Sequence, residues 1–305
     1  MLTAMWSGLG GKAAERWAAL LTSPALLFWI GGVLAYVWAN GGLFGTDAGW
    51  SALAAVWTQT FGTTTPVSEA VLAVCALLLV AGSARLADLV TPTVLRLLEG
   101  YWGRVAGPLT ALRGKAIDRK ITRWRDLARR RSELSNGERQ RYQRLNAWRV
   151  GVPADPRDRM PTRLGNLLKA AESRPRHRYG LDAVVCWPRL WLVMPEAART
   201  EVTAARARLD EGARLWLWSL LFCVWAVFTW WALAFALLGM IIGYRTILGG
   251  AAVYGRLVLS CHDLYRKDLY TALGWELPAD AREEIRAGQR LTAFLERGPQ
   301  LAEPT

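Results

Sequence analysis

Apolar residues are concentrated in three runs, at residues 17–38, 71–90 and 215–261. Each of the first two runs is about 20 residues long, which is the length of an α-helix that crosses the hydrocarbon core of a bilayer. Trp17 and Trp38 stand at the ends of the first run, as is typical of side chains at a membrane–water interface. The pattern predicts an all-α integral membrane protein.

The third run contains 47 residues, of which only Arg245 and Arg256 are charged. A single helix of that length would extend about 70 Å, more than twice the hydrocarbon thickness. We therefore expect two helices that turn between Phe235 and Tyr244, which gives four membrane spans in total. The alternative is one long tilted helix over residues 215–244, followed by a helix that lies in the membrane interface.

Charged residues are distributed unevenly and predict an orientation. Between Gly100 and Arg214 lie 26 of the 38 Lys and Arg residues but only 12 of the 25 Asp and Glu residues. This segment carries a net charge of +14, whereas the remainder of the chain carries −1. Residues 39–68 contain no Lys or Arg. Because Lys and Arg favour the cytoplasmic side of a membrane, we expect residues 39–68 outside and both termini in the cytosol.

These features predict two transmembrane helical hairpins with an inserted basic cytosolic helical domain. The expected segments are an N-terminal membrane hairpin at 1–99 with spans at about 18–38 and 70–90, the basic domain at 100–214, a C-terminal membrane hairpin at 215–262 and a cytosolic tail at 263–305.

The basic segment has helical periodicity and recognisable helix starts. One helical face is predicted from the spacing of Ile117, Ile121, Trp124 and Ala128. Ser135 and Glu138 have the spacing of a capping box at the start of the next helix. Thr162 is expected to cap a short helix that runs through Ala171. Pro195 is expected in the first turn of a helix that continues into the third membrane span.

Two stretches of this segment have a distinctive composition, Met160-Pro-Thr-Arg-Leu-Gly-Asn-Leu-Leu-Lys-Ala-Ala-Glu172 and Arg178-Tyr-Gly-Leu-Asp-Ala-Val-Val-Cys-Trp-Pro-Arg-Leu-Trp191. Pro195 and Glu196 follow them. The pattern resembles one in bacterial multi-pass membrane proteins, over about 50 residues. The resemblance implies a membrane protein of a recurring bacterial type, in the cytoplasmic (inner) membrane. It implies no activity, cofactor or catalytic residue.

The chain lacks the sequence motifs of common enzyme active sites, namely GxSxG, HExxH and a P-loop. Ser260-Cys261-His262-Asp263 gathers reactive side chains, but neighbouring residues on a helix point in different directions. No CxxC pair is present, so neither a zinc site nor a disulfide framework is expected. We expect no enzyme activity, no catalytic residue, no cofactor and no metal. The four cysteines are Cys75, Cys186, Cys223 and Cys261.

Four charged residues lie within or beside the apolar runs, where charges are costly. They are Arg85, Asp88, Arg245 and Arg256. Arg85 and Arg256 each lie about five residues inside the cytoplasmic end of a run, and these residues are candidates for the lining of a pore or vestibule. The alternative is that the long Arg side chains extend to the lipid headgroups, and Asp88 is placed to form an ion pair with Arg85.

A stripe of small residues in the last run predicts close helix packing. Gly239, Gly243, Thr246 and Gly250 share one face of a helix and include a GxxxG pattern. This face is expected to pack against the third span of the same chain or against a second copy.

The Arg-rich stretch at 113–149 predicts contact with an anionic surface. Its candidate contact residues are Arg123, Arg125, Arg129, Arg130 and Arg131. Anionic lipid headgroups attract juxtamembrane bases, and we expect these headgroups as the main partner. An acidic partner surface is the next alternative. Nucleic acid is an unlikely partner, although Trp124, Tyr142 and Trp148 interleave the bases as aromatic residues do in single-strand binders.

Two hypotheses of function follow from these features. The first is an oligomeric, channel-like inner-membrane protein that favours anions. The second is a membrane-anchored scaffold, or a signalling or stress-defence effector, whose cytosolic helical domain docks a partner.

Overall fold

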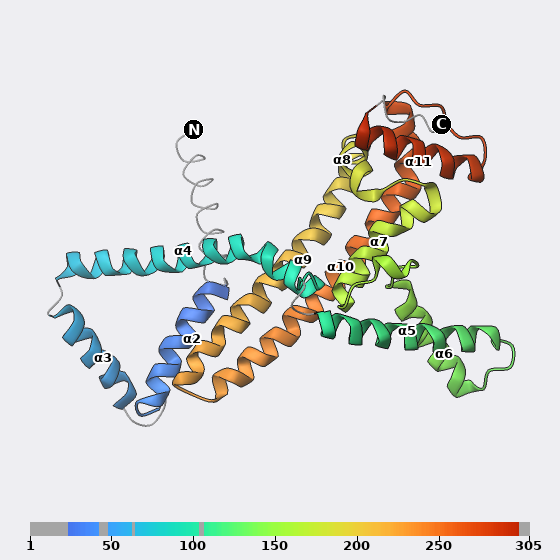
Figure 1. Cartoon of the computed structure of the whole chain (residues 1–305). Helices are drawn as coiled ribbons and strands as arrows, with labels where there is room; N and C mark the ends of the chain where they lie inside the picture. Colours follow the sequence, from blue (N-terminus) through green and yellow to red (C-terminus); the bar gives the residue numbers. More distant parts are fainter. Residues whose placement is uncertain (1–23, 43–47, 63–64, 104–106, 299–305) are drawn as a thin grey trace. The chain divides into compact units, whose positions relative to one another are not determined.

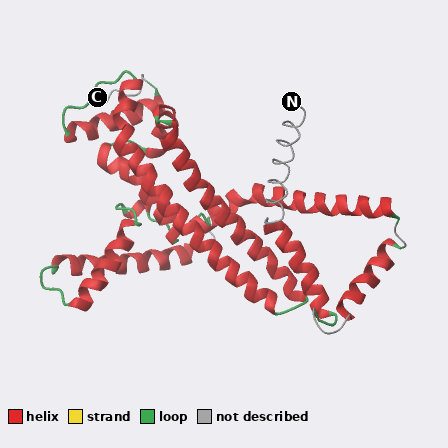
Figure 2. Cartoon of the chain, turned by 180° about the vertical axis from the view of Figure 1, so that it is seen from behind, coloured by secondary structure: helices red, strands yellow, loops and turns green. Residues whose placement is uncertain are grey.

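The structure is a computed structural model that describes residues 24–42, 48–62, 65–103 and 107–298. All regular structure in these residues is helical and they contain no strand (Figure 2), which confirms the all-α prediction. The first predicted span begins at residue 18, so its first six residues lie outside the described part of the chain.

Ten α-helices and two short 3₁₀ segments follow one another along the described residues (Figure 1). The α-helices are α2 (Pro24–Ala39), α3 (Ala48–Phe61), α4 (Pro66–Glu99), α5 (Gly107–Arg129), α6 (Asn136–Val150), α7 (Arg163–Tyr179), α8 (Ala183–Val193), α9 (Glu196–Phe222), α10 (Trp231–Ala272) and α11 (Ala281–Arg297). The 3₁₀ segments are η2 (Pro156–Asp158) and η3 (Cys223–Val227). The predicted helix starts at Thr162 and Pro195 are confirmed, whereas α7 extends beyond Ala171 and α3 was not predicted.

The described chain divides into two compact units. Unit 1 comprises the described residues up to 94 together with 210–245, and unit 2 comprises 95–209 together with the described residues from 246 onward. The helices α4, α9 and α10 each contribute one part to unit 1 and the other to unit 2. This division differs from the predicted segments, because residues 246–262, which were expected in the C-terminal membrane hairpin, belong to unit 2 and residues 215–245 to unit 1.

The chain reverses direction between α9 and α10 earlier than predicted. Only η3 and residues 228–230 separate the two helices. The prediction of a turn between Phe235 and Tyr244 is therefore wrong, and so is the alternative of one uninterrupted helix over residues 215–244.

Aromatic packing within unit 1 explains why the turn carries no polar signal. The Phe28 ring of α2 lies 5.3 Å from the Trp218 ring and 5.1 Å from the Trp225 ring, measured between centroids. Trp225 Nε1 also donates a hydrogen bond to the carbonyl oxygen of Phe28, at 3.1 Å. Tertiary contacts to α2, and not loop-forming residues, thus position the reversal.

Two helices, α4 and α10, are long and apolar enough to cross a membrane. Of the 18 consecutive residues that are most apolar in each helix, only 6% in α4 and 22% in α10 are buried within the protein. Apolar side chains that face outward over such a length distinguish these helices from the core helix of a soluble protein. The apolar helix α2 has 16 residues, fewer than the roughly 20 that span the hydrocarbon core.

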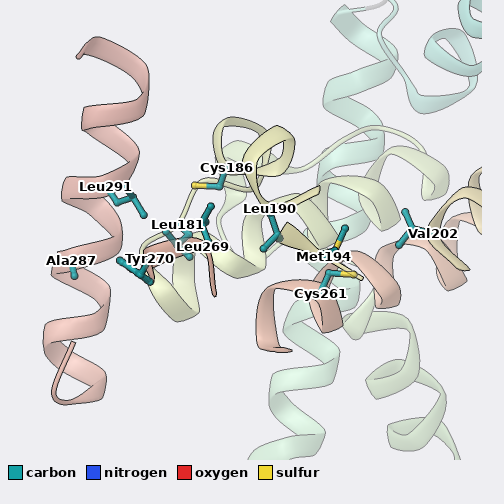
Figure 3. Close-up of a cluster of buried hydrophobic side chains, with 10 residues drawn as sticks. All are labelled: Leu181, Cys186, Leu190, Met194, Val202, Cys261, Leu269, Tyr270, Ala287 and Leu291. Atoms are coloured by element: carbon teal, nitrogen blue, oxygen red, sulfur yellow. The ribbon is translucent and has the colours of Figure 1, made fainter. Parts of the chain in front are cut away.

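Unit 2 has a hydrophobic core to which four helices and the α7–α8 junction contribute (Figure 3). Leu181 lies between α7 and α8, and Leu190 belongs to α8. Leu269 of α10 and Leu291 of α11 complete the most buried part, and all four are fully buried. The second half of α10 thus contributes Cys261, Leu269 and Tyr270 to this core.

Candidate anion-binding surface

The helices α5 and α6 form a hairpin whose turn carries the predicted capping box. The Ser135 hydroxyl accepts a hydrogen bond from the Glu138 backbone N–H at 3.4 Å, and the Glu138 carboxylate accepts one from the Ser135 N–H at 3.0 Å. This prediction is confirmed. Ile121, Leu127 and Leu134 are the buried apolar side chains of the hairpin.

Aromatic rings in the hairpin are covered by its own cations. The Lys120 ammonium lies 5.4 Å from the centroid of the Trp148 ring, and the Arg149 guanidinium lies 5.8 Å from that of Trp124. Trp124 Nε1 also donates a hydrogen bond to the Asn146 side chain at 3.2 Å. Cation–π contacts of this kind hold helices together. The Trp124 and Trp148 rings thus contribute to the contacts between α5 and α6.

The hairpin presents a strongly positive surface. Residues 107–150 contain 13 Lys and Arg and four Asp and Glu, a net charge of +9. Every one of these bases except Arg149 is exposed. Two ion pairs are recorded for the described hairpin residues, Arg130 with Glu138 at 3.9 Å and Asp118 with Arg159, which lies outside the hairpin. All five predicted contact residues are exposed on this hairpin, at Arg123, Arg125, Arg129, Arg130 and Arg131.

A cavity of about 410 Å³ lies where α5, the end of α6 and the start of α7 meet. Arg113 and Lys120 of α5 and Arg163 of α7 contribute basic side chains to its lining, and no acidic residue lines it. The rest of the wall consists of apolar residues such as Ile117 and Leu167, of Trp148, and of the polar residues Thr162 and Asn166. The cavity therefore combines an apolar surface with concentrated positive charge.

Positive charge is also crowded next to the hairpin. Burial, together with the neighbouring guanidinium groups of Arg159, Arg125 and Arg174, lowers the pKa of Arg149. Burial and the nearby Arg178 lower the pKa of Arg174. Because guanidinium pKa values are very high, both groups stay charged at neutral pH, and this side of unit 2 carries a field that favours anions.

The structure separates the residues that were predicted to line a pore. Arg85 and Asp88 of α4 are exposed in unit 1. Asp88 pairs with Arg214 of α9, at 3.5 Å between the carboxylate and Nε, in place of the predicted pairing with Arg85. Arg245 is exposed in unit 1, whereas Arg256 is exposed in unit 2.

Arg256 was predicted to lie inside a membrane span because of the apolar residues around it. Those residues belong to unit 2, where a Cβ on Gly255 would lie 3.0 Å from Ala171 of α7. A helical core and a membrane select the same apolar side chains, and the role of Arg256 in a vestibule stays a prediction.

The small residues of α10 face α9. A Cβ on Gly239 would overlap the Ser219 hydroxyl, and one on Gly243 would lie 2.8 Å from the Trp216 backbone nitrogen. In unit 2, a Cβ on Gly250 would lie 3.1 Å from the backbone nitrogen of Leu209. All three glycines therefore allow close packing with α9 of the same chain.

The segment that carries the bacterial resemblance organises unit 2. Thr162 Oγ1 donates a hydrogen bond to the carbonyl oxygen of Glu99 at 2.6 Å and accepts one from Gly165 N–H at 3.0 Å. Asp182 caps α8, and its own N–H donates to Thr292 of α11 at 3.1 Å. These residues join helices, and their contacts give them a structural role.

The side chains of Cys261, His262 and Asp263 in α10 contact different neighbours in unit 2. His262 is fully buried, and its Nδ1 lies 2.8 Å from the carbonyl oxygen of Val258. Its ring is stacked on Trp187 at 6.0 Å between centroids. Cys261 is buried in the core, while Asp263 accepts a hydrogen bond from the Tyr179 hydroxyl at 2.5 Å. Within the described residues no group of three or more His, Cys, Asp and Glu is placed to hold a metal.

No protein-family model matches the chain, and neither a curated protein nor a solved structure shows significant similarity to it.

The cavity was not predicted from the sequence, although Ile117 and Trp148 were named there for other reasons. Arg113, Ala116, Ile117 and Lys120 follow helical spacing and share one face of α5. That face could have been recognised from the sequence. Its position opposite Arg163 could not, because 43 residues separate Lys120 from Arg163 along the chain.

Proposed function

We propose that this protein is a membrane-anchored adaptor, in which unit 1 holds the chain in a bacterial cytoplasmic membrane and unit 2 docks an acidic partner protein in the cytosol. The two described helices that are long and apolar enough to cross a membrane, α4 and α10, would provide the spans, and in unit 1 the apolar part of α9 from Leu215 and that of α10 up to Tyr244 would lie in the bilayer. The charged residues Arg214 and Arg245 stand at the ends of these apolar parts. The positive-inside tendency supports cytosolic termini.

The net charge of +9 on the exposed α5–α6 hairpin carries this proposal. Packing cannot account for these charges, because exposed bases contribute little to the stability of a helical pair. A surface of this sign attracts acidic partners and increases their rate of association. An exposed helical surface of this kind suits the surface of an acidic protein.

Photo-crosslinking of the full-length protein in cells tests this function. A crosslinking residue at Gln143, an exposed position of α6, is expected to give adducts with a protein. The combined variant Arg123→Gln, Arg125→Gln and Arg129→Gln should reduce their yield several-fold. A control variant with Lys267→Gln, Arg286→Gln and Arg290→Gln removes three exposed bases elsewhere in unit 2 and should leave the yield unchanged.

Two results would overturn the adaptor proposal. One is an equal yield of adducts from the hairpin variant and the control variant. The other is crosslinking to lipid or nucleic acid alone, which would identify a different class of partner.

An oligomeric, anion-favouring channel is a second candidate function. Arg85 is exposed on α4, whose most apolar 18 residues have a mean hydropathy of 2.2. The nearby Asp88 forms an ion pair with Arg214. In a ring of copies, Arg85 side chains would line a common aqueous path. Liposomes containing the purified protein should then show chloride flux that Arg85→Gln reduces. Absence of flux under voltage, tension and pH variation argues against this function.

A further inference from the structure

The cavity at the base of the α5–α6 hairpin has the size and construction of a small-molecule site. Its volume of about 410 Å³ lies within the range of ligand pockets, roughly 300–1,000 Å³. Three separate elements form its wall, since α5 supplies Ile117, the end of α6 supplies Trp148 and α7 supplies Leu167. A ligand in this position would contact all three elements at once.

The positive charge of the cavity is not neutralised by the protein. Within the part of the chain that the structure describes, Arg113, Lys120 and Arg163 form no ion pair. Asp118, the carboxylate nearest to them in α5, pairs instead with Arg159. All three bases line the same cavity, and Arg113 also donates a hydrogen bond to the Pro161 carbonyl oxygen at 3.5 Å. An anion bound in the cavity would offset the repulsion between these like charges.

The basic side chains that line the cavity are of the kinds that bind phosphate groups. Guanidinium groups bind phosphate oxygens through paired hydrogen bonds, and Lys acts as a point charge. Trp148 lines the same cavity, with the Lys120 ammonium 5.4 Å from the centroid of its ring. Arg163 is also the first residue of α7, where the partial positive charge of a helix start adds to that of the side chains.

We propose that this cavity binds a small phosphate-bearing ligand, with Arg113, Lys120 and Arg163 holding the phosphate and the apolar wall holding the adjoining part of the molecule. The phosphate belongs either to a soluble nucleotide or to an anionic lipid headgroup. Two of the three bases, Arg113 and Lys120, also belong to the exposed hairpin that docks the partner in the adaptor function, but the ligand site does not depend on that function.

Calorimetric titration of the full-length protein in maltoside micelles tests this site. ADP represents the nucleotide, short-chain phosphatidic acid the anionic headgroup, and short-chain phosphatidylcholine is the zwitterionic reference. One of the two anionic probes is expected to bind with a stoichiometry near one per chain. Arg113→Gln and Lys120→Gln should each weaken that binding about tenfold, equivalent to about 1.4 kcal/mol.

Matched controls distinguish a specific site from nonspecific attraction of anions to a basic protein. Lys115→Gln and Arg119→Gln remove exposed bases of the same helix that do not line the cavity, and each should change the affinity less than about twofold. Equal losses in control and cavity variants, or no saturable binding of either anionic probe, would overturn the proposal. Partner crosslinking at Gln143 reports separately on the adaptor function, so failure of one proposal is distinguishable from failure of the other.

Discussion

The start of α7 is joined to the end of α4 by contacts that leave no room for a side chain at position 165. A Cβ on Gly165 would overlap the carbonyl oxygen of Glu99, which also accepts a hydrogen bond from Thr162. The side chain of Asn166, itself buried, accepts a hydrogen bond from Met160 N–H at 3.1 Å and donates one to the Thr162 carbonyl at 2.6 Å. This junction also forms one wall of the cavity, so its geometry affects both stability and ligand binding.

Replacement of Gly165 by alanine should therefore destabilise unit 2 by about 1–3 kcal/mol, because the backbone of α4 must move to accommodate the new methyl group. Differential scanning fluorimetry of the purified protein measures the effect as a lower melting temperature. Gly114→Ala is the matched control, since nothing lies within 4 Å of a Cβ there and alanine favours the helix α5. Equal melting temperatures for the two variants would contradict this role of Gly165.

At the scale of elements, α10 shows which properties a sequence reveals and which it conceals. Its helical character, its apolar residues and its stripe of glycines were predicted from periodicity and composition. The environment of residues 246–262 was not, because lipid and protein cores select the same apolar side chains. The turn before Trp231 was misplaced because an aromatic contact between Phe28 and Trp225, distant in sequence, determines it.

Two exposed positions of α10 should differ in their access to water. Leu238 in unit 1 is 54% exposed and Leu264 in unit 2 is 68% exposed. If unit 1 lies in the bilayer, Leu238→Cys should react with a membrane-impermeant maleimide at least tenfold more slowly than Leu264→Cys, because lipid excludes both water and the reagent. The background is the protein in membrane vesicles with its native cysteines replaced. Equal labelling rates in detergent show that both thiols are reactive, and equal rates in vesicles would contradict the placement of unit 1.

At the scale of the whole molecule, the net charge of +13 arises from one segment and not from the protein as a whole. Residues 100–214 carry +14, and the remaining apolar runs and connections are close to neutral. The structure adds that much of this charge lies on a single helical hairpin, α5–α6, while other bases of the segment are paired with acids, as Arg176 is with Asp158. Charge distribution along a sequence thus predicts orientation in a membrane, whereas the division between paired and available charges requires the fold.

The orientation itself is testable through the turn of the hairpin. Arg129 ends α5, and Arg130 and Arg131 follow in the turn. All three are exposed, so trypsin should cleave there whenever it reaches the cytosolic face. Inverted membrane vesicles should therefore yield a cut near residue 130, whereas intact spheroplasts should protect the chain, because translocating this segment would carry its positive charges across the membrane. A variant with glutamine at all three positions should lose this cut alone and retain slower cuts elsewhere in unit 2. Cleavage at this turn in sealed spheroplasts would reverse the assigned topology and remove the cytosolic partner from consideration.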